Sequence, residues 1–225
     1  MDGRYANNFD TVRMNYTGSY RPWKYVFANF LSQANHTAWT RDSLKAFLDN
    51  STVGNKKSLI VFGNTIAINN DPNFGFPNAA DSIFYRQYLK SLTISTSWQS
   101  NIPDSESKFR GVGYFSGISQ DSVQDPNSNN LALIKPVNGG APAFKPMSVT
   151  GNGNDSCIAV SYNGTSFNSF FMSNKFSSLR STYESPSDGP VLVYTKIMDW
   201  LLNAGTSAKL LDIKIFPEGL YNVNN

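Results

Sequence analysis

An unbroken run of apolar residues at positions 59–62 is the clearest structural signal in the chain. Such a run predicts a strand that is buried on both faces, as in a parallel sheet covered by helices. We therefore expect this strand to be central in an α/β fold. Because ligands of such sheets bind beyond the carboxyl ends of the strands, we expect a binding surface just after it. The candidate residues of this surface are Asn64, Thr65 and Asn69.

Apolar residues recur at helical spacing in four other segments. Each segment has a start signal, namely Pro22, Thr40, Asn78 or Pro190, and Gly205 is the stop signal of the last. The side chains expected to face inward are, in order, Trp23, Val26, Phe27, Phe30 and Leu31; Leu44, Phe47 and Leu48; Ile83, Phe84 and Tyr88; and Tyr194, Ile197, Met198, Leu201 and Leu202.

Between residues 92 and 176 the pattern changes to short alternating runs separated by Gly, Pro and Asn, which predicts strands and hairpins. Asn163-Gly164 is a two-residue turn signal between the last two runs. The predicted strands of this part are residues 131–134, 143–149, 157–162 and 167–172, and two more are predicted at residues 9–17 and 210–216.

These elements predict one α/β domain over residues 1–205 with a β-rich insert at about residues 92–176. Residues 206–225 are expected to form a terminal strand, or the start of a following domain. A chain of 225 residues with 40% hydrophobic and 14% aromatic residues is long and apolar enough to bury a full core.

Charge and composition exclude several classes of partner. The net charge of +3 is spread along the chain, and Lys56-Lys57 is the one adjacent basic pair, so nucleic acid is not an expected partner. No stretch reaches the roughly 18 apolar residues that span a bilayer, so membrane insertion is not expected either. The richness in Asn, Ser, Thr and Gly is typical of extracellular or cell-surface proteins, although the first residues of the sequence, 1–4, lack the apolar region of a signal peptide.

Candidate catalytic residues are few. The single histidine, His36, and the single cysteine, Cys157, could form a nucleophile and base pair, but a cysteine inside a predicted strand is typical of an inert buried thiol. The glycines around Ser116, at residues 111–117, match neither a phosphate-binding loop nor a nucleophile elbow, and we expect them to bend a strand. We predict no enzyme activity and no cofactor.

Two Asn/Asp loops place side-chain oxygens at alternate residues, as a calcium loop does. Neither has the glutamate that a calcium loop carries at its twelfth position, and ordinary turn chemistry explains both, so no metal is expected. The calcium candidates are Asn69, Asp71 and Asn73 in one loop, and Asp125, Asn127 and Asn129 in the other.

The order of four segments resembles a known domain family: residues 10–12 leading to Gly18-Ser19, residues 43–48 before 57–63, residues 157–162 with 169–172, and residues 197–202. The chain resembles the extracellular class I glutamine-amidotransferase-like domains of multidomain surface or secreted bacterial proteins, of the Bacteroidetes and Ignavibacteria type. The resemblance implies a flavodoxin-like, mostly parallel sheet flanked by helices.

Two departures from that family limit what the resemblance implies. Catalytic members carry a cysteine on the turn after the central strand, paired with a histidine, and here Gly63, Asn64 and Thr65 occupy that turn, so amidotransferase activity is not implied. Members also begin with a strand and helix that this chain lacks. An upstream segment or a neighbouring subunit would supply this first βα unit, unless residues 1–8 or 101–130 fold back to fill the gap.

Three functions therefore compete. The first is a non-catalytic structural or interaction module, whose partner is another protein or a second copy of the chain. The second is a carbohydrate-binding module that uses exposed aromatic residues, and the third is a hydrolase with an atypical nucleophile. The candidate aromatic residues are Trp98, Tyr114 and Tyr183, and the candidate hydrolase residues are Thr65 or Ser116 as nucleophile, assisted by Asp71 or Asp121.

Overall fold

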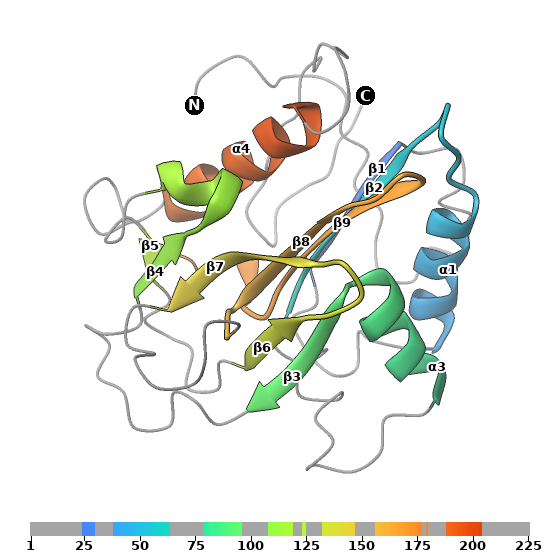
Figure 1. Cartoon of the computed structure of the whole chain (residues 1–225), viewed down its shortest axis with the longest axis horizontal. Helices are drawn as coiled ribbons and strands as arrows, with labels where there is room; N and C mark the ends of the chain where they lie inside the picture. Colours follow the sequence, from blue (N-terminus) through green and yellow to red (C-terminus); the bar gives the residue numbers. More distant parts are fainter. Residues whose placement is uncertain are drawn as a thin grey trace, which may run out of the picture.

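The computed structural model describes residues 24–29, 38–63, 79–95, 108–118, 123–124, 132–146, 156–176, 179 and 188–203. These residues form an α/β fold, in which helices flank a mixed seven-stranded sheet and a smaller two-stranded sheet lies beside it (Figure 1). The strands are β1 (Tyr25–Asn29), β2 (Lys57–Phe62), β3 (Ser91–Ser95), β4 (Lys108–Gly111), β5 (Val123–Gln124), β6 (Leu133–Pro136), β7 (Ala141–Pro146), β8 (Ala159–Asn163) and β9 (Phe167–Met172). The helices are α1 (Ala38–Asp49), α3 (Ala79–Ile83), the π-helical η3 (Phe84–Tyr88), the 3-10 helical η5 (Gly113–Gly117) and α4 (Asp188–Asn203).

The large sheet has the strand order β1-β2-β9-β8-β7-β4-β5, and the small sheet pairs β3 with β6. Strand β2 is parallel to β1 and to β9, whereas every other neighbouring pair is antiparallel. The expectation of a mostly parallel sheet is therefore wrong. The physical reason is the insert, in which the tight β8–β9 hairpin and the pairing of β7 with β8 and β4 impose antiparallel neighbours.

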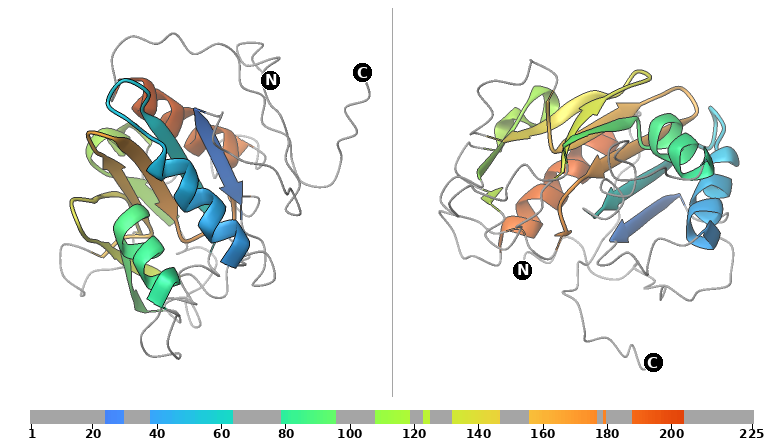
Figure 2. Two further views of the ribbon diagram at one scale, coloured as in Figure 1. Left: turned by 90° about the vertical axis from the view of Figure 1, so that its right-hand side faces the viewer. Right: turned by 90° about the horizontal axis from the view of Figure 1, so that it is seen from below.

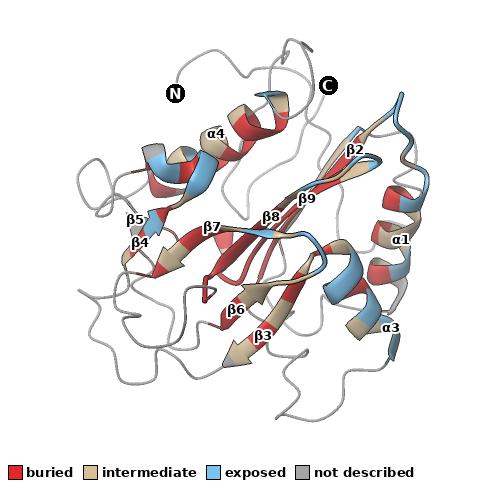
Figure 3. Cartoon of the chain, viewed as in Figure 1, coloured by how far each residue is buried: buried red, intermediate tan, exposed pale blue. Residues whose placement is uncertain are grey.

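The predicted central strand is confirmed. Strand β2 lies between β1 and β9, and all six of its residues are buried. Leu59 and Val61 pack into the core beneath α1 and η3, and Ile60 and Phe62 pack into the core beneath α4. Figure 3 shows the buried residues concentrated on β2, β8 and β9. Helices therefore cover both faces of this strand, as a continuous apolar run predicts.

The two faces of the sheet carry different cores. Helices α1 and α3 lie on one side of the large sheet and α4 lies on the other (Figures 1 and 2). The first core contains Leu44 and Phe47 of α1 with Phe84 and Tyr85 of η3, and the second contains residues of α4, η5 and β4. Alternate residues of β1, β2, β8 and β9 divide between the two cores, as the two-residue period of a strand requires.

One predicted helix is a strand instead. The segment after Pro22 was expected to be helical, but Tyr25–Asn29 forms β1, parallel to β2. Tyr25 and Phe27 pack on the α4 side, and Val26 and Ala28 pack on the α1 side. A short, uninterrupted apolar run fits both periods, and its burial on two faces decides for the strand. Strand β1, helix α1 and strand β2 thus form a βαβ unit at this edge of the described sheet.

The other three predicted helices are present, with one error in a buried face. Helix α1 buries Leu44, Phe47 and Leu48 as expected, and α4 buries Tyr194, Ile197, Met198 and Leu201. Ile83 was expected to face inward, but it is 44% exposed and Tyr85 is buried in its place. The wide turn of η3, in which the Leu89 N–H donates to the carbonyl of Phe84 (3.2 Å), rotates Ile83 outward where α3 passes into η3.

Turns in the β-rich part were partly predicted. The β8–β9 hairpin is confirmed, although Asn163 pairs with Asn168, so its turn is longer than two residues. A second turn, at residues 137–140, joins β6 to β7. Asn138 and Gly139 both have positive φ values of 50° and 86°, as a type I′ turn requires.

Several predicted elements fall outside the described residues. These are the strands at residues 9–17 and 210–216, the helix stop at Gly205, and residues 206–225 as a separate piece. The proposed domain limits and the missing first βα unit therefore stay predictions.

Candidate functional site

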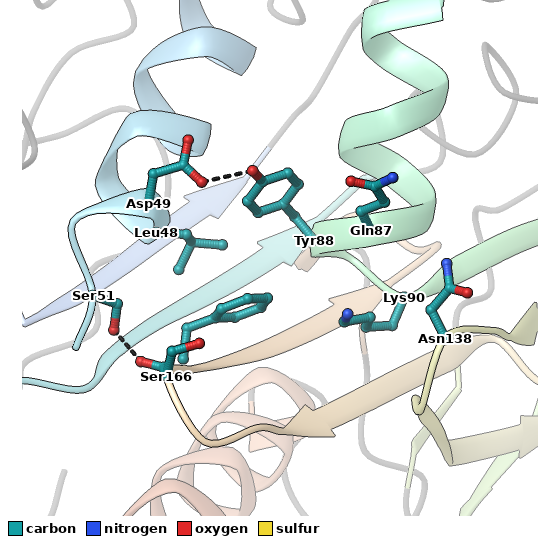
Figure 4. A pocket seen from close by; sticks show the side chains of 9 residues that line it. Leu48, Asp49, Ser51, Gln87, Tyr88, Lys90, Asn138 and Ser166 are labelled. Atoms are coloured by element: carbon teal, nitrogen blue, oxygen red, sulfur yellow. Dashed lines mark hydrogen bonds between the residues drawn. The ribbon is translucent and has the colours of Figure 1, made fainter. Parts of the chain in front are cut away.

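A pocket of about 510 Å³ opens at the amino ends of β2 and β9 (Figure 4). It lies at the end of the sheet opposite to the one where the sequence predicts a binding surface. The lining residues are Leu48, Asp49, Ser51, Gln87, Tyr88, Lys90, Asn138, Ser166 and Phe167.

Four segments that are distant in sequence meet at this pocket. Helix α1 and η3 both end there, and they bring Asp49 and Tyr88 to the rim. The β6–β7 turn contributes Asn138, and the β8–β9 turn contributes Ser166. In a βαβ unit the helix runs back against the strands, so the carboxyl end of α1 lies beside the amino end of β2.

Hydrogen bonds tie these segments together. The hydroxyl of Ser51 donates to the carbonyl oxygen of Ser166 and accepts the backbone N–H of Lys57 (2.7 Å). The hydroxyl of Ser169 donates to the carbonyl of Tyr88 (2.6 Å). The pocket is therefore held by rigid parts of the fold, which lowers the entropy lost when a ligand binds.

Both oxygens of the Asp49 carboxylate accept a hydrogen bond at one side of the pocket. Its Oδ1 accepts the hydroxyl of Tyr88 (2.6 Å), and its Oδ2 accepts the ammonium of Lys45 (2.7 Å). The hydrogen bond to Asp49 raises the pKa of Lys45, whereas burial first, and then Asp49, raises the pKa of Tyr88. At neutral pH the Asp49 charge is compensated by Lys45, and Tyr88 keeps its proton.

Lys90 lies on the other side of the pocket and has an unusual backbone conformation. Its φ of 58° is in the left-handed region, at the position after the C-cap of η3 that usually holds glycine. Its Nζ lies 4.2 Å from the ring centre of Tyr162 and 5.5 Å from that of Phe167. Burial lowers its pKa. Among the ion pairs of the described residues, none involves Lys90.

Aromatic rings form one wall of the pocket. Tyr88 is stacked on Phe84 at 5.9 Å and 25°, and on Phe167 at 5.9 Å and 22°. Tyr162 contacts Phe167 in turn, with their ring centres 5.2 Å apart. This row of contacting rings is rigid, because each ring packs against its neighbours.

Two side-chain amides complete the rim. Asn138 lines the pocket, and its Nδ2 donates to the carbonyl of Arg86 (3.0 Å). Gln87 is exposed. An amide offers both donors and acceptors, so these two residues suit a ligand with hydroxyl groups.

The nine lining residues include no histidine or cysteine, and the hydroxyl of Ser51 is committed to the backbone. These nine residues therefore contain no Ser-His or Cys-His pair of the kind that activates a nucleophile.

Most of the residues singled out in the sequence lie outside the described residues. They are His36, Asn64, Thr65, Asn69, Asp71, Asn73, Trp98, Asp121, Asp125, Asn127, Asn129 and Tyr183. Within the described part of the chain, no group of three or more His, Cys, Asp or Glu residues could hold a metal ion.

The structure does place three of the candidates. Cys157 is completely buried, as expected of a core thiol, and its backbone forms an isolated antiparallel β-bridge with Ile134. Ser116 is exposed on η5. Tyr114 is 44% exposed, as expected of an exposed aromatic residue; its hydroxyl accepts the Nδ2 of Asn203 (2.6 Å), and the Nζ of Lys196 lies 5.1 Å from its ring centre.

The glycines next to Ser116 have the structural role that was expected of them. A side chain at Gly111 would collide with the carbonyl of Phe115, and Gly113 has a positive φ of 59°. These two positions let the chain turn sharply from β4 into η5.

Comparisons of the sequence with protein families and with curated proteins do not assign the chain to a family. No protein-family model matches the sequence, and no curated protein is significantly similar to it. Among the described helices, none has the length and hydropathy needed to cross a membrane.

Proposed function

We propose that this chain is a non-catalytic binding module, and that it binds a glycan in the pocket at the amino ends of β2 and β9. The observation that carries the proposal is the composition of this pocket, in which an aromatic wall faces amide and charged side chains. The proposal thus combines the interaction module and the carbohydrate-binding alternative, with a different set of residues from Trp98, Tyr114 and Tyr183.

Sugars have two kinds of surface, and the pocket has a counterpart for each. The C–H faces of a sugar ring are apolar and pack on aromatic surface, which Phe167 and Tyr88 contribute to the lining of the pocket. The ring hydroxyls donate and accept hydrogen bonds, which Gln87 and Asn138 can return.

The proposal also includes the location and the fold of the module. We place it outside the bacterial cell, as part of a surface or secreted protein, and we assign it a flavodoxin-like, glutamine-amidotransferase-like fold. Support for the place comes from the composition, which is low in charge and rich in Asn, Ser and Thr. Support for the fold comes from the βαβ unit and the helices on both faces of β2.

The test is a glycan array followed by calorimetry with any glycan that is retained. Replacing Gln87 by alanine is expected to weaken binding about fivefold, since one hydrogen bond contributes about 1 kcal/mol. Gln87 is exposed, so its truncation leaves the core intact. Ser116→Ala on η5 is the matched control and should bind as the parent does. No retained glycan, or equal loss in both variants, would contradict the proposal.

The absence of catalysis is a separate prediction. The chain is expected to turn over no ester, amide or glutamine substrate, because residues 63–65, which follow the central strand in sequence, include no cysteine and because Cys157 is buried. A colorimetric substrate panel checks this. Turnover that disappears in Cys157→Ala, Thr65→Ala or Ser116→Ala would show that the protein is an enzyme.

Self-association is a second candidate function, and one observation favours it. Among the described strands β1 pairs with β2 alone, and all five of its residues are partly exposed. A strand edge with unpaired backbone groups is a template for another chain. Light scattering on the dilute chain should then give a mass above the 24.9 kDa of one copy. A monodisperse monomer that melts cooperatively would remove this candidate.

A further inference from the structure

We propose that the glycan bound in this pocket carries a carboxylate, as a uronic acid does, and that the ammonium of Lys90 pairs with it. This inference rests on the proposed function, because it names the chemical class of the ligand for the same pocket. It is argued from the charges, the backbone and the arrangement of the lining residues.

The first argument is the balance of charge in the pocket. Asp49 is compensated by Lys45 at 2.7 Å, and its other oxygen accepts Tyr88. The other polar lining side chains, apart from Lys90, are neutral. Lys90 therefore leaves one positive charge in the pocket that no carboxylate of the described residues compensates.

The second argument is the unused bonding capacity of Lys90. Its Nζ lies over the rings of Tyr162 and Phe167, which attract the charge through their faces. Such contacts do not satisfy the three N–H donors of an ammonium as an oxygen acceptor would. A ligand carboxylate would supply charged acceptors, which make the stronger class of hydrogen bond.

The third argument is the position of Lys90 in the backbone. A left-handed residue after a helix is usually glycine, and a lysine is strained there. The carbonyl of Lys90 accepts the N–H of Val137 (2.8 Å), which holds this strained residue beside the turn that carries Asn138. The fold thus keeps a cation where a residue without a side chain would fit better.

The arrangement of side chains also separates the ligand carboxylate from Asp49. Figure 4 shows Gln87, Lys90 and Asn138 on one side of the pocket, and Asp49 and Ser51 on the other. A uronate carboxylate on the Lys90 side would lie between two amides and away from the like charge of Asp49. The sugar hydroxyls would then extend toward the rest of the rim.

The test compares uronate-containing oligosaccharides with the same oligosaccharides after reduction of the carboxyl group to a primary alcohol. Calorimetry of the full chain at low salt should show that the acidic form binds about tenfold more tightly, as one charge-assisted contact predicts. Lys90→Gln and Lys90→Gly should both remove this preference. Lys90→Gly also relieves the backbone strain, so it is expected to fold.

A matched control is available on α4. Lys196→Gln removes the same charge from above another tyrosine ring, Tyr114, and should keep the tenfold preference. Equal binding of the acidic and reduced forms by the parent would overturn the carboxylate inference and leave glycan binding in place. Binding of neither form would overturn both. Competition by free acetate as strong as by the uronate would show a plain anion site and would also overturn the inference.

Discussion

Replacing Phe170 by alanine is expected to lower the free energy of unfolding by about 3–5 kcal/mol. Phe170 is in the middle of β9 and is fully buried. Its ring lies 5.6 Å from Phe115 and 5.9 Å from Phe62, so truncation leaves a cavity between η5 and the central strands. Such a loss is a large part of the roughly 5–15 kcal/mol that stabilises a typical domain.

Urea denaturation, monitored by circular dichroism, measures this change in the free energy of unfolding. The control is Val53→Ala, because Val53 is 76% exposed and its truncation should change stability by less than about 0.5 kcal/mol. A Phe170→Ala protein as stable as the control would mean that the core beneath α4 is not packed as described.

The second large effect is expected at Gly111. A Cβ at this position would lie 1.8 Å from the carbonyl oxygen of Phe115 and 2.6 Å from its carbonyl carbon. Both are backbone atoms of η5, so the collision cannot be relieved by rotating a side chain. We expect Gly111→Ala to destabilise the protein by about 3 kcal/mol, at the upper end of overpacking effects.

Gly54→Ala is the matched glycine control. No atom lies within 4 Å of a Cβ at Gly54, and alanine restricts the unfolded chain more than glycine does. Its effect is therefore expected to lie between none and a stabilisation of about 1 kcal/mol. Thermal melting of both variants checks the pair. Equal melting temperatures would contradict the close approach of β4 and η5.

Elements with a long or unambiguous pattern could be predicted from the sequence. The central strand at residues 59–62 has four consecutive apolar residues, and α4 repeats its apolar face over several turns. In α4 the helical period fits much better than the strand period, whereas the run at residues 59–62 is identified as a strand by its short length and by the glycine that follows it.

The edge strand could not be predicted in the same way. In β1 the residues Tyr25, Val26, Phe27 and Ala28 are all compatible with a helix face or with two strand faces. Its partner, β2, is about thirty residues away, so the local pattern does not contain the decisive information. The face of η3 was misassigned because a π-helical turn leaves no mark in the apolar spacing of Ile83 and Phe84.

The pocket could not be predicted from the sequence, because its lining residues come from four segments that are distant in sequence and no single segment contains the whole pocket. Asp49, Lys90, Asn138 and Ser166 meet through the sheet order, which brings β9 beside β2 although over a hundred residues separate them. One signal was present, since Asn138-Gly139 is the dipeptide of a type I′ turn and marks the rim. The rule that ligands bind at the carboxyl ends of strands predicted a binding surface at the opposite end of the sheet, so it could not predict a pocket at the amino ends of β2 and β9.

Nuclear magnetic resonance with a retained glycan tests the central claim most directly, because it locates the ligand on the protein. Backbone and side-chain amide signals would be assigned and then followed as the glycan is added. We predict that the largest shifts occur at Gln87, Lys90, Asn138 and Ser166, and that Ser116 on η5 is unaffected. Shifts that cluster instead around Tyr114 and α4, or at Asn64 and Thr65 beyond the carboxyl end of β2, would contradict the pocket as the binding site.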